Sequence, residues 1–195
     1  MKIFKFGGAS VKDAEGVKNV LHVLNTVGHE DVLLVISAMG KTTNALEVVI
    51  KNYFDKSKEL HASLQEVRKY HNQILLDLFE DEDHDVFFDI NAHFDDLEYF
   101  IRSNKSPNYS FVYDQVVSIG ELVSTTIVSH YFNYSGLKNN WIDVRPLIKT
   151  DNNYRDAQVD WETTQKLISK GVKKKTLNIT QGFLGSDENN FTTTL

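Results

Sequence analysis

Three stretches of the sequence combine residue types that can bind an anion or an amine. In the first, KFGGAS, Lys5 precedes the glycine pair Gly7 and Gly8, and Ser10 follows. Adjacent glycines give the backbone access to positive φ, so their N–H groups can converge on a phosphate, to which Lys5 adds a positive charge. The alternative is a simple Gly-Gly turn, in which Ser10 or Asp13 caps the following helix. The spacing of these residues does not decide between the two.

The second stretch, VISAMGKTTN, repeats this arrangement. A strand is expected to end at Ser37, a turn of small residues contains Gly40, and a helix is expected to start near residues 42–44. In an open α/β sheet, ligands bind beyond the carboxyl ends of the strands, so two such turns predict a shared cleft. The alternative is that Thr42, Thr43 and Asn44 are helix caps and nothing more.

The third stretch is SIGELVST, within a mostly apolar run that predicts a buried helix. Glu121 lies in this run, and Ser118, Ser124 and Thr125 share its face because they are three or four residues away. Small hydroxyl side chains around one carboxylate predict a face that another group approaches closely. The alternative is a carboxylate on a narrow exposed stripe of the helix.

A repeated pattern of helix, glycine and strand must position these residues. A helical periodicity over 13–27 ends at Gly28, as a left-handed C-cap would require, and the apolar run DVLLVIS follows as a strand buried on both faces. The pattern returns with Gly136 and a strand ending near Val144, and again with Gly171 and a strand over 176–180. With a first strand at KIFKF, the pattern predicts an α/β fold whose mainly parallel sheet is covered by helices on both faces.

A helical excursion is predicted at about 45–110, between the second predicted strand and the helix that carries Glu121. The acidic segment 80–85 is expected to be a solvated joint between two helices, and RSNKSPNYS is expected to be a loop. The sequence ends at NNFTTTL, a strand-prone run without a following turn. We therefore expect the chain to be a fragment of a longer domain.

Composition excludes several classes of protein. The 195 residues carry a net charge of −6, which argues against non-specific nucleic-acid binding, and no stretch approaches the roughly 20 apolar residues of a spanning helix. The chain has no cysteine, so disulfides and thiolate metal sites are excluded, and its scattered histidines do not predict a metal site. We expect a cytoplasmic protein with no membrane or nucleic-acid partner.

Five stretches in order then show a resemblance to a known family. KFGGASV resembles the N-terminal signature of aspartate kinases, members of the amino-acid kinase family, and ISAMGKTTN, SIGELVST, WIDVR and ITQGFLGS resemble further motifs of that family. The resemblance runs through nearly the whole chain and is least specific between about 50 and 110. It implies a three-layer αβα sandwich of the carbamate kinase-like type, of which residues 1–195 would be the N-terminal, aspartate-binding portion of the catalytic domain.

The resemblance also implies residue roles. Lys5 would stabilise the transferred phosphoryl group, and Gly7, Gly8 and Ser10 would cradle phosphate oxygens. The substrate side would comprise Ser37 and Thr43 as contacts of the aspartate carboxylates and Glu121 as the partner of its α-amino group, with a wall formed by Gln181, Gly182 and Phe183. No metal ligand is implied in the chain itself, because Mg²⁺ would be held by the phosphates of ATP.

The implied reaction is ATP-dependent phosphorylation of the side-chain carboxylate of L-aspartate, the first step in making lysine, threonine and methionine, by a homo-oligomer in the full-length protein. Two departures from the family pattern matter: Ala9 replaces a usual Ser or Thr, and the sequence stops where a glycine-rich turn and most of the nucleotide site, followed by regulatory modules, are expected. The 195 residues alone are therefore expected to be inactive. The alternatives are another kinase of the family, glutamate 5-kinase or acetylglutamate kinase, and a non-catalytic binding or oligomerisation module.

Overall fold

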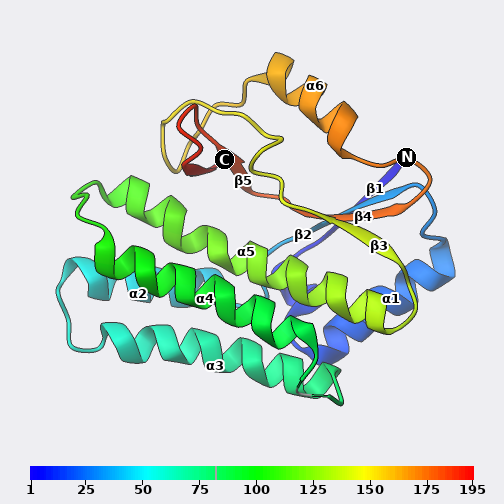
Figure 1. The fold of residues 1–195 in the computed structure, drawn as a ribbon, viewed down its shortest axis with the longest axis horizontal. Helices are drawn as coiled ribbons and strands as arrows, with labels where there is room; N and C mark the ends of the chain where they lie inside the picture. The colour runs from blue at the N-terminus through cyan, green and yellow to red at the C-terminus, as the bar shows by residue number, and fades with distance from the viewer. Residues whose placement is uncertain (82) are drawn as a thin grey trace.

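A parallel four-stranded sheet forms the centre of the computed structural model, which describes residues 1–81 and 83–195. The strands are β1 (Lys2–Phe6), β2 (Val32–Ile36), β3 (Asn139–Ile142) and β4 (Leu177–Gln181), arranged in the order β1-β2-β4-β3 (Figure 1). All three strand pairs are parallel. The prediction of an α/β fold with a mainly parallel sheet is thus confirmed.

Helices lie on both sides of this sheet. The helices α1 (Ala14–Val27), α2 (Thr42–Phe54), α3 (Leu60–Leu78), α4 (Asp85–Ser103) and α5 (Tyr109–Tyr134) lie on one side, and α6 (Trp161–Gly171) lies on the other (Figure 1). A small antiparallel pair, β5 (Leu184–Ser186) and β6 (Thr192–Thr194), follows β4 near the end of the chain. Helix α5 packs directly against the sheet and is itself covered by α2 and α4. This explains why it is apolar around nearly its whole circumference.

The two faces of the sheet are unequally covered. In β2, Val32, Leu34 and Ile36 are fully buried, whereas the alternate residues Leu33 and Val35 are only half-buried. The prediction that this strand is buried on both faces was therefore too strong. The physical reason is the small amount of chain on the α6 side, where one short helix replaces the layer of five on the other face.

Helix ends follow the predicted glycine rule in two of three places. Gly28 and Gly136 have φ of 88° and 85°, and the N–H of Gly28 caps α1 by donating to the carbonyl of Leu24. Gly171 was predicted to act in the same way, and this was wrong: it is the last residue of α6 and has no positive φ. A Cβ at this position would lie 2.7 Å from the Leu147 side chain, so the glycine allows close packing instead of a left-handed turn.

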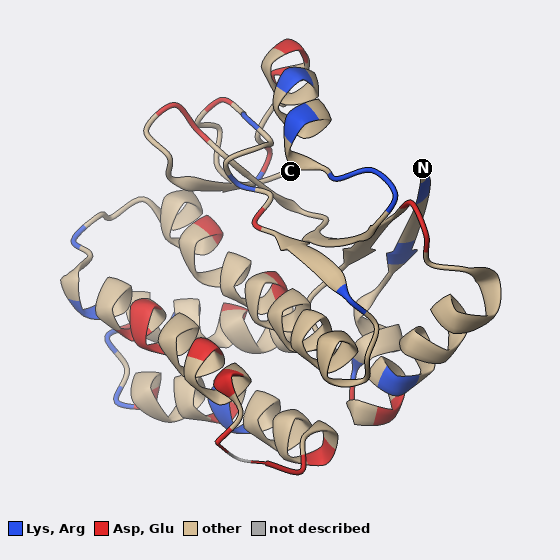
Figure 2. Ribbon diagram, turned by 45° about the vertical axis from the view of Figure 1, so that its right-hand side comes forward, with Lys and Arg blue, Asp and Glu red and all other residues tan. Residues whose placement is uncertain are grey.

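The predicted helical excursion is confirmed as α2, α3, α4 and the first turn of α5. Helix α3 ends at Leu78 and α4 begins at Asp85, as expected for a joint at 80–85, although residue 82 of that joint lies outside the described residues. Helix α4 carries several Asp and Glu residues, seen as red bands in Figure 2, and Arg102 is its only lysine or arginine. In the described part of the chain, no helix combines the length and the apolarity needed to cross a bilayer.

Candidate active site

The carboxyl ends of three neighbouring strands bring the predicted site residues together. Phe6, Ile36 and Gln181 are paired in register across β1, β2 and β4. The segments that follow them, 7–10, 37–41 and 182–183, therefore emerge side by side at one edge of the sheet. The segments predicted to share a cleft therefore lie at one edge of the sheet.

The first two of these segments form one hydrogen-bonded unit. The N–H of Gly40 donates to the carbonyl of Gly8 at 2.9 Å, and the N–H of Ser37 donates to the carbonyl of Phe6 at 3.1 Å. A Cβ on Gly8 would lie 2.5 Å from the carbonyl oxygen of Ala38, so only glycine allows the two segments to approach this closely. Gly40 has φ of 54° and is the glycine of this pair of loops that requires the left-handed region.

The glycine pair does not use the positive φ that glycine permits. Gly7 is extended, and Gly8 begins a 3₁₀ turn, η1 (Gly8–Val11). Within it, the N–H of Ser10 donates to the carbonyl of Gly7 at 2.9 Å. A Cβ on Gly7 would meet no atom within 4 Å, which leaves open space on this side of the loop.

Helix α1 does not follow the glycine loop directly, because it begins only at Ala14. Its N-cap is Asp13, whose carboxylate accepts the N–H of Gly16 at 2.8 Å. The capping interpretation is therefore correct for Asp13. The α1 N-terminus is separated from Gly7 by η1, so a short 3₁₀ turn, and not an α-helix, directly follows Gly7.

Glu121 lies on α5 directly beneath the turn that follows β4. Its Oε2 accepts the N–H groups of Gly182 at 2.9 Å and Phe183 at 3.0 Å, and the residue is only 6% exposed. The interpretation of Glu121 as part of an exposed stripe is therefore wrong. Among the described residues, Oε1 makes no hydrogen bond, so one oxygen of this carboxylate is left for a ligand.

Helix α5 packs closely against the second loop, and this packing fixes the position of Glu121 relative to the turn at 182–183. A Cβ on Gly120 would lie 3.0 Å from the Cβ of Ala38 and 3.1 Å from Cγ2 of Thr42. The hydroxyl of Ser124, one turn further on, donates to the carbonyl of Ser37 at 2.8 Å. The sequence predicted that another group would approach the hydroxyl-bearing face of this helix closely. At Ser124 that group is the protein's own second loop.

Burial and the neighbouring donor and charged groups shift the pKa of the Glu121 carboxyl group in opposite directions. Burial raises the pKa of its carboxyl group to about 7, and the N–H donors of Gly182 and Phe183 and the positive charge of Lys5 act in the lowering direction. Lys5 alternates along β1 with Phe4 and Phe6, which pack against the core, so its side chain leaves the strand on the opposite face. Lys5 is nevertheless next to the carboxyl end of β1, the edge at which Glu121 binds the 182–183 turn, and its charge is the smallest of these influences on the carboxyl pKa.

The remaining predicted residues differ in burial and in the hydrogen bonds of their side chains. Thr43 and Ser37 are half-buried, and no hydrogen bond of either hydroxyl is recorded within the described part of the chain. The side chain of Gln181 is 1% exposed and fully engaged: it donates to Thr125 Oγ1 at 2.7 Å and accepts the N–H of Val144 at 2.9 Å. Gln181 therefore positions the turn at 182–183, whereas Gly182 and Phe183 line the edge through their backbone.

Arg145 is a further candidate that the sequence analysis left without a role. It follows β3 at the same edge of the sheet, and its guanidinium pairs with Asp143 at 2.6 Å while remaining partly exposed. The motif WIDVR contained the signal, since a strand followed by a cation at this edge matches the placement of Lys5. The described residues contain no cluster of three or more His, Asp or Glu side chains arranged to hold a metal ion.

Comparison with known proteins places this geometry in a family. The model of the amino acid kinase family matches residues 1–194. The chain is 26% identical over 202 residues to the chloroplastic bifunctional aspartokinase/homoserine dehydrogenase 2 of Arabidopsis thaliana, and 26% identical over 194 residues to the aspartokinase of Chlamydia trachomatis. Each alignment covers 99% of this chain, but only 22% and 42% of the respective relative.

Solved structures show the same relationship. The structure of E. coli aspartokinase III in complex with lysine and aspartate superposes with a TM-score of 0.86 at 25% identity, covering all of this chain and 43% of that one. An aspartate kinase from Clostridium acetobutylicum superposes with a TM-score of 0.79 at 20% identity. The chain thus spans between about a fifth and two-fifths of the length of these relatives.

Proposed function

The chain belongs to the amino acid kinase family, and from this premise we propose that it is the N-terminal, substrate-binding portion of an aspartate kinase catalytic domain. The proposed reaction transfers the γ-phosphoryl group of ATP to the side-chain carboxylate of L-aspartate. The observation that carries the proposal is the pairing of Glu121 with the backbone of the 182–183 turn at the same sheet edge as Lys5 and the two glycine loops.

The two charged groups suit the two ends of such a reaction. Glu121 has one oxygen held by two N–H groups and the other unused, so it would accept the α-ammonium of an amino acid. Lys5 would lie beside the phosphoryl group and reduce the repulsion between the phosphate and the attacking carboxylate. Ser37 and Thr43, on the second loop, would contact the carboxylates of the substrate, and Arg145 offers a second cation for the same purpose.

The chemistry requires no protein base. An aspartate carboxylate is already ionised at neutral pH, so catalysis depends on positioning and on charge stabilisation. The open space around Gly7 and the adjacent Lys5 fit the phosphates of ATP, and Gly8 and Ser10 would complete the cradle. Mg²⁺, which would neutralise phosphate charge, would arrive bound to the phosphates of the nucleotide.

The role of Glu121 favours an acceptor that carries a free ammonium group. Burial of the carboxylate without a partner is costly, so a substrate that lacks the ammonium, such as an N-acetylated amino acid, would bind poorly. This argues for aspartate over acetylglutamate as the substrate. A cytoplasmic location is a part of the proposal that rests on the composition of the chain. A place in lysine biosynthesis and assembly into a homo-oligomer are parts that rest on the resemblance.

The direct test is an acyl phosphate assay on the longest natural polypeptide that contains this chain. Hydroxylamine trapping would measure product from ATP with L-aspartate, L-glutamate or N-acetyl-L-glutamate as the acceptor. We expect product with aspartate and little with the other two. Product from glutamate or acetylglutamate alone would identify a different kinase of the family, and no product from any acceptor, in a folded protein that binds no ATP, would favour a non-catalytic module.

A further inference from the structure

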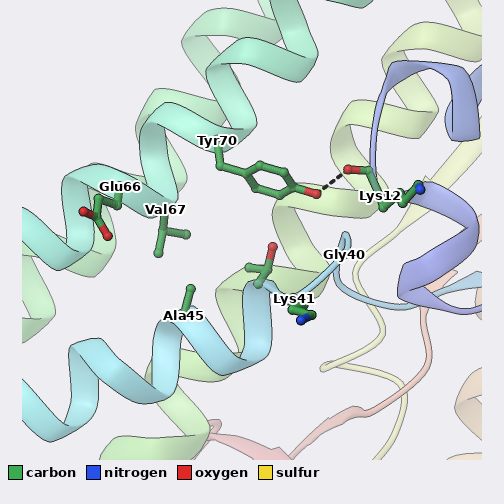
Figure 3. Close-up of a pocket in the computed structure, with 8 residues that line it drawn as sticks. Lys12, Gly40, Lys41, Ala45, Glu66, Val67 and Tyr70 are labelled. Atoms are coloured by element: carbon green, nitrogen blue, oxygen red, sulfur yellow. Dashed lines mark hydrogen bonds between the residues drawn. The ribbon is translucent and has the colours of Figure 1, made fainter.

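A cavity of about 420 Å³ lies behind the second glycine loop, between α2 and α3 (Figure 3). Its walls are apolar: Val67 of α3 is almost fully buried, Ala45 of α2 faces it, and the ring of Tyr70 closes one end. None of the residues proposed to act on aspartate or ATP lines it. The cavity is therefore a separate site, large enough for a small organic molecule.

Two lysines stand at one end of this cavity. Lys12, which follows η1, and Lys41, which precedes α2, both line it, and neither forms an ion pair with another residue of the described chain. Two such cations beside one cavity stand out in a chain whose net charge is −6. They favour an anionic group on the molecule that would occupy the cavity.

The N-terminus of α2 adds to this preference. Its N-cap residue is Lys41, so no side chain caps the first turn of this 13-residue helix, and Thr42 of that turn lines the cavity. The N–H of Thr42 donates to the carbonyl of Met39, so what this helix start adds is the positive end of the helix dipole. Glu66 lies at the other end of the cavity from the two lysines (Figure 3). The anionic group is thereby directed to the lysine end, and the tail towards Glu66.

We propose that this cavity binds a small organic anion, a carboxylate or phosphate ester whose hydrocarbon part packs against Ala45, Val67 and Tyr70. Its anionic group pairs with Lys12 and Lys41. Binding there is coupled to the glycine loops of the active site through Tyr70.

The coupling follows from the contacts of Tyr70. Its hydroxyl donates to the backbone carbonyl of Lys12, and a Cβ on Gly40 would lie only 2.6 Å from that hydroxyl oxygen. On its other side, Gly40 donates its N–H to Gly8. A molecule that displaces the Tyr70 ring therefore acts on both glycine loops at once. The binding site stands independently of the proposed kinase activity, and only the consequence for catalysis rests on it.

The test uses NMR spectroscopy of the ¹⁵N-labelled chain with hexanoate and monohexyl phosphate as probes and hexylammonium as the cationic control. We expect both anions to shift the amides of Gly40, Thr42, Ala45 and Tyr70 saturably, and hexylammonium to leave them unchanged. The double variant Lys12→Met/Lys41→Met should weaken hexanoate binding roughly tenfold, since two partly exposed ion pairs are lost. The matched control is Lys69→Met, an exposed lysine of α3 outside the cavity, which should bind as the unmodified chain does.

Two further variants test the site and its coupling to the glycine loops separately. Ala45→Trp should fill the cavity and abolish the shifts; should it not fold, the lysine variants still decide. Equal binding of hexylammonium, or unchanged hexanoate affinity in the double variant, would overturn the site. Hexanoate should also shift the Gly8 amide in the unmodified chain, and this shift should disappear in Tyr70→Phe while the Ala45 shift persists. A Gly8 shift that is absent at first, or unaltered by Tyr70→Phe, would overturn the coupling.

Discussion

The carboxylate of Glu121 accepts the backbone N–H of Gly182 at 2.9 Å and thereby joins the buried helix α5 to the turn that ends β4. The same oxygen also binds the next amide, that of Phe183. This contact fixes the position of Glu121 relative to the edge of the sheet and leaves its second carboxylate oxygen for a ligand.

Replacement of Glu121 by glutamine should reduce selectivity for an ammonium-bearing substrate. The amide keeps the shape of the side chain and one acceptor oxygen, but it loses the charge that would pair with the α-ammonium. In the proposed kinase, we expect kcat/KM for aspartate to fall by about 100-fold, since a buried charged pair contributes roughly 2–3 kcal/mol, with the KM for ATP little changed. A collapse of ATP binding with an intact aspartate KM would show that Glu121 belongs to the nucleotide side.

The pH dependence of stability should report the protonation of Glu121. Its pKa of about 7 in the folded chain is above the ordinary value of 4.5, so the folded state binds more protons than the unfolded state between these two values. Unfolding free energy should therefore decrease as the pH rises from about 5 to 7, by about 3 kcal/mol in total. Urea unfolding at a series of pH values measures this change, and Glu121→Gln should flatten the curve. A Gln variant with the same slope would assign the slope to other groups.

Replacement of Lys5 by methionine should remove catalysis while preserving the fold. Lys5 is exposed on β1, so its loss removes no buried side chain. In the proposed kinase we expect aspartyl phosphate formation to fall by about 10²–10³-fold, as for other residues that stabilise transition-state charge. Lys2→Met is the matched control, an exposed lysine at the amino end of the same strand. Near-normal turnover by the Lys5 variant would contradict the assigned role.

The same Lys5 variant should move the titration of Glu121. The positive charge of Lys5 lowers the pKa of that carboxyl group, so its removal should raise the pKa further above 7. ¹³C NMR of the Glu121 carboxyl carbon measures the shift directly, and Lys2→Met again serves as the control. An unchanged titration would mean that the two groups do not share one space.

The two glycines of the first loop should differ in their tolerance of alanine. A Cβ at position 8 would lie 2.5 Å from the carbonyl oxygen of Ala38 and 2.9 Å from that of Gly40, whereas a Cβ at position 7 would meet nothing within 4 Å. We expect Gly8→Ala to lower the free energy of unfolding by about 2 kcal/mol, because the loops must separate, and Gly7→Ala to change it by less than about 0.5 kcal/mol. Urea unfolding of the pair checks this. Equal losses would indicate that the loops do not pack as described.

The sequence alone determined the architecture of this protein because the relevant signals are local. The apolar run at 32–36 indicates a buried strand, and Gly28 and Gly136 mark helix ends since a left-handed C-cap strongly favours glycine. Parallel strands then bring their carboxyl ends to one edge, so the meeting of the loops after Phe6 and Ile36 followed from the predicted topology. Lys5 and Glu121 could be singled out by residue type and by their neighbours.

Only the tertiary structure decided what those residues contact. The need for glycine at position 8 comes from the Ala38 carbonyl and not from local backbone strain, and glycine at position 171 is required by Leu147, 24 residues earlier in the chain. The raised pKa of Glu121 depends on how deeply α5 lies beneath the turn at 182–183, and the cavity beside Tyr70 exists only where α3 packs on α2. Each of these features depends on contacts between segments that are remote in sequence. Residue periodicity indicates which face of an element is buried, but it does not indicate what packs against that face.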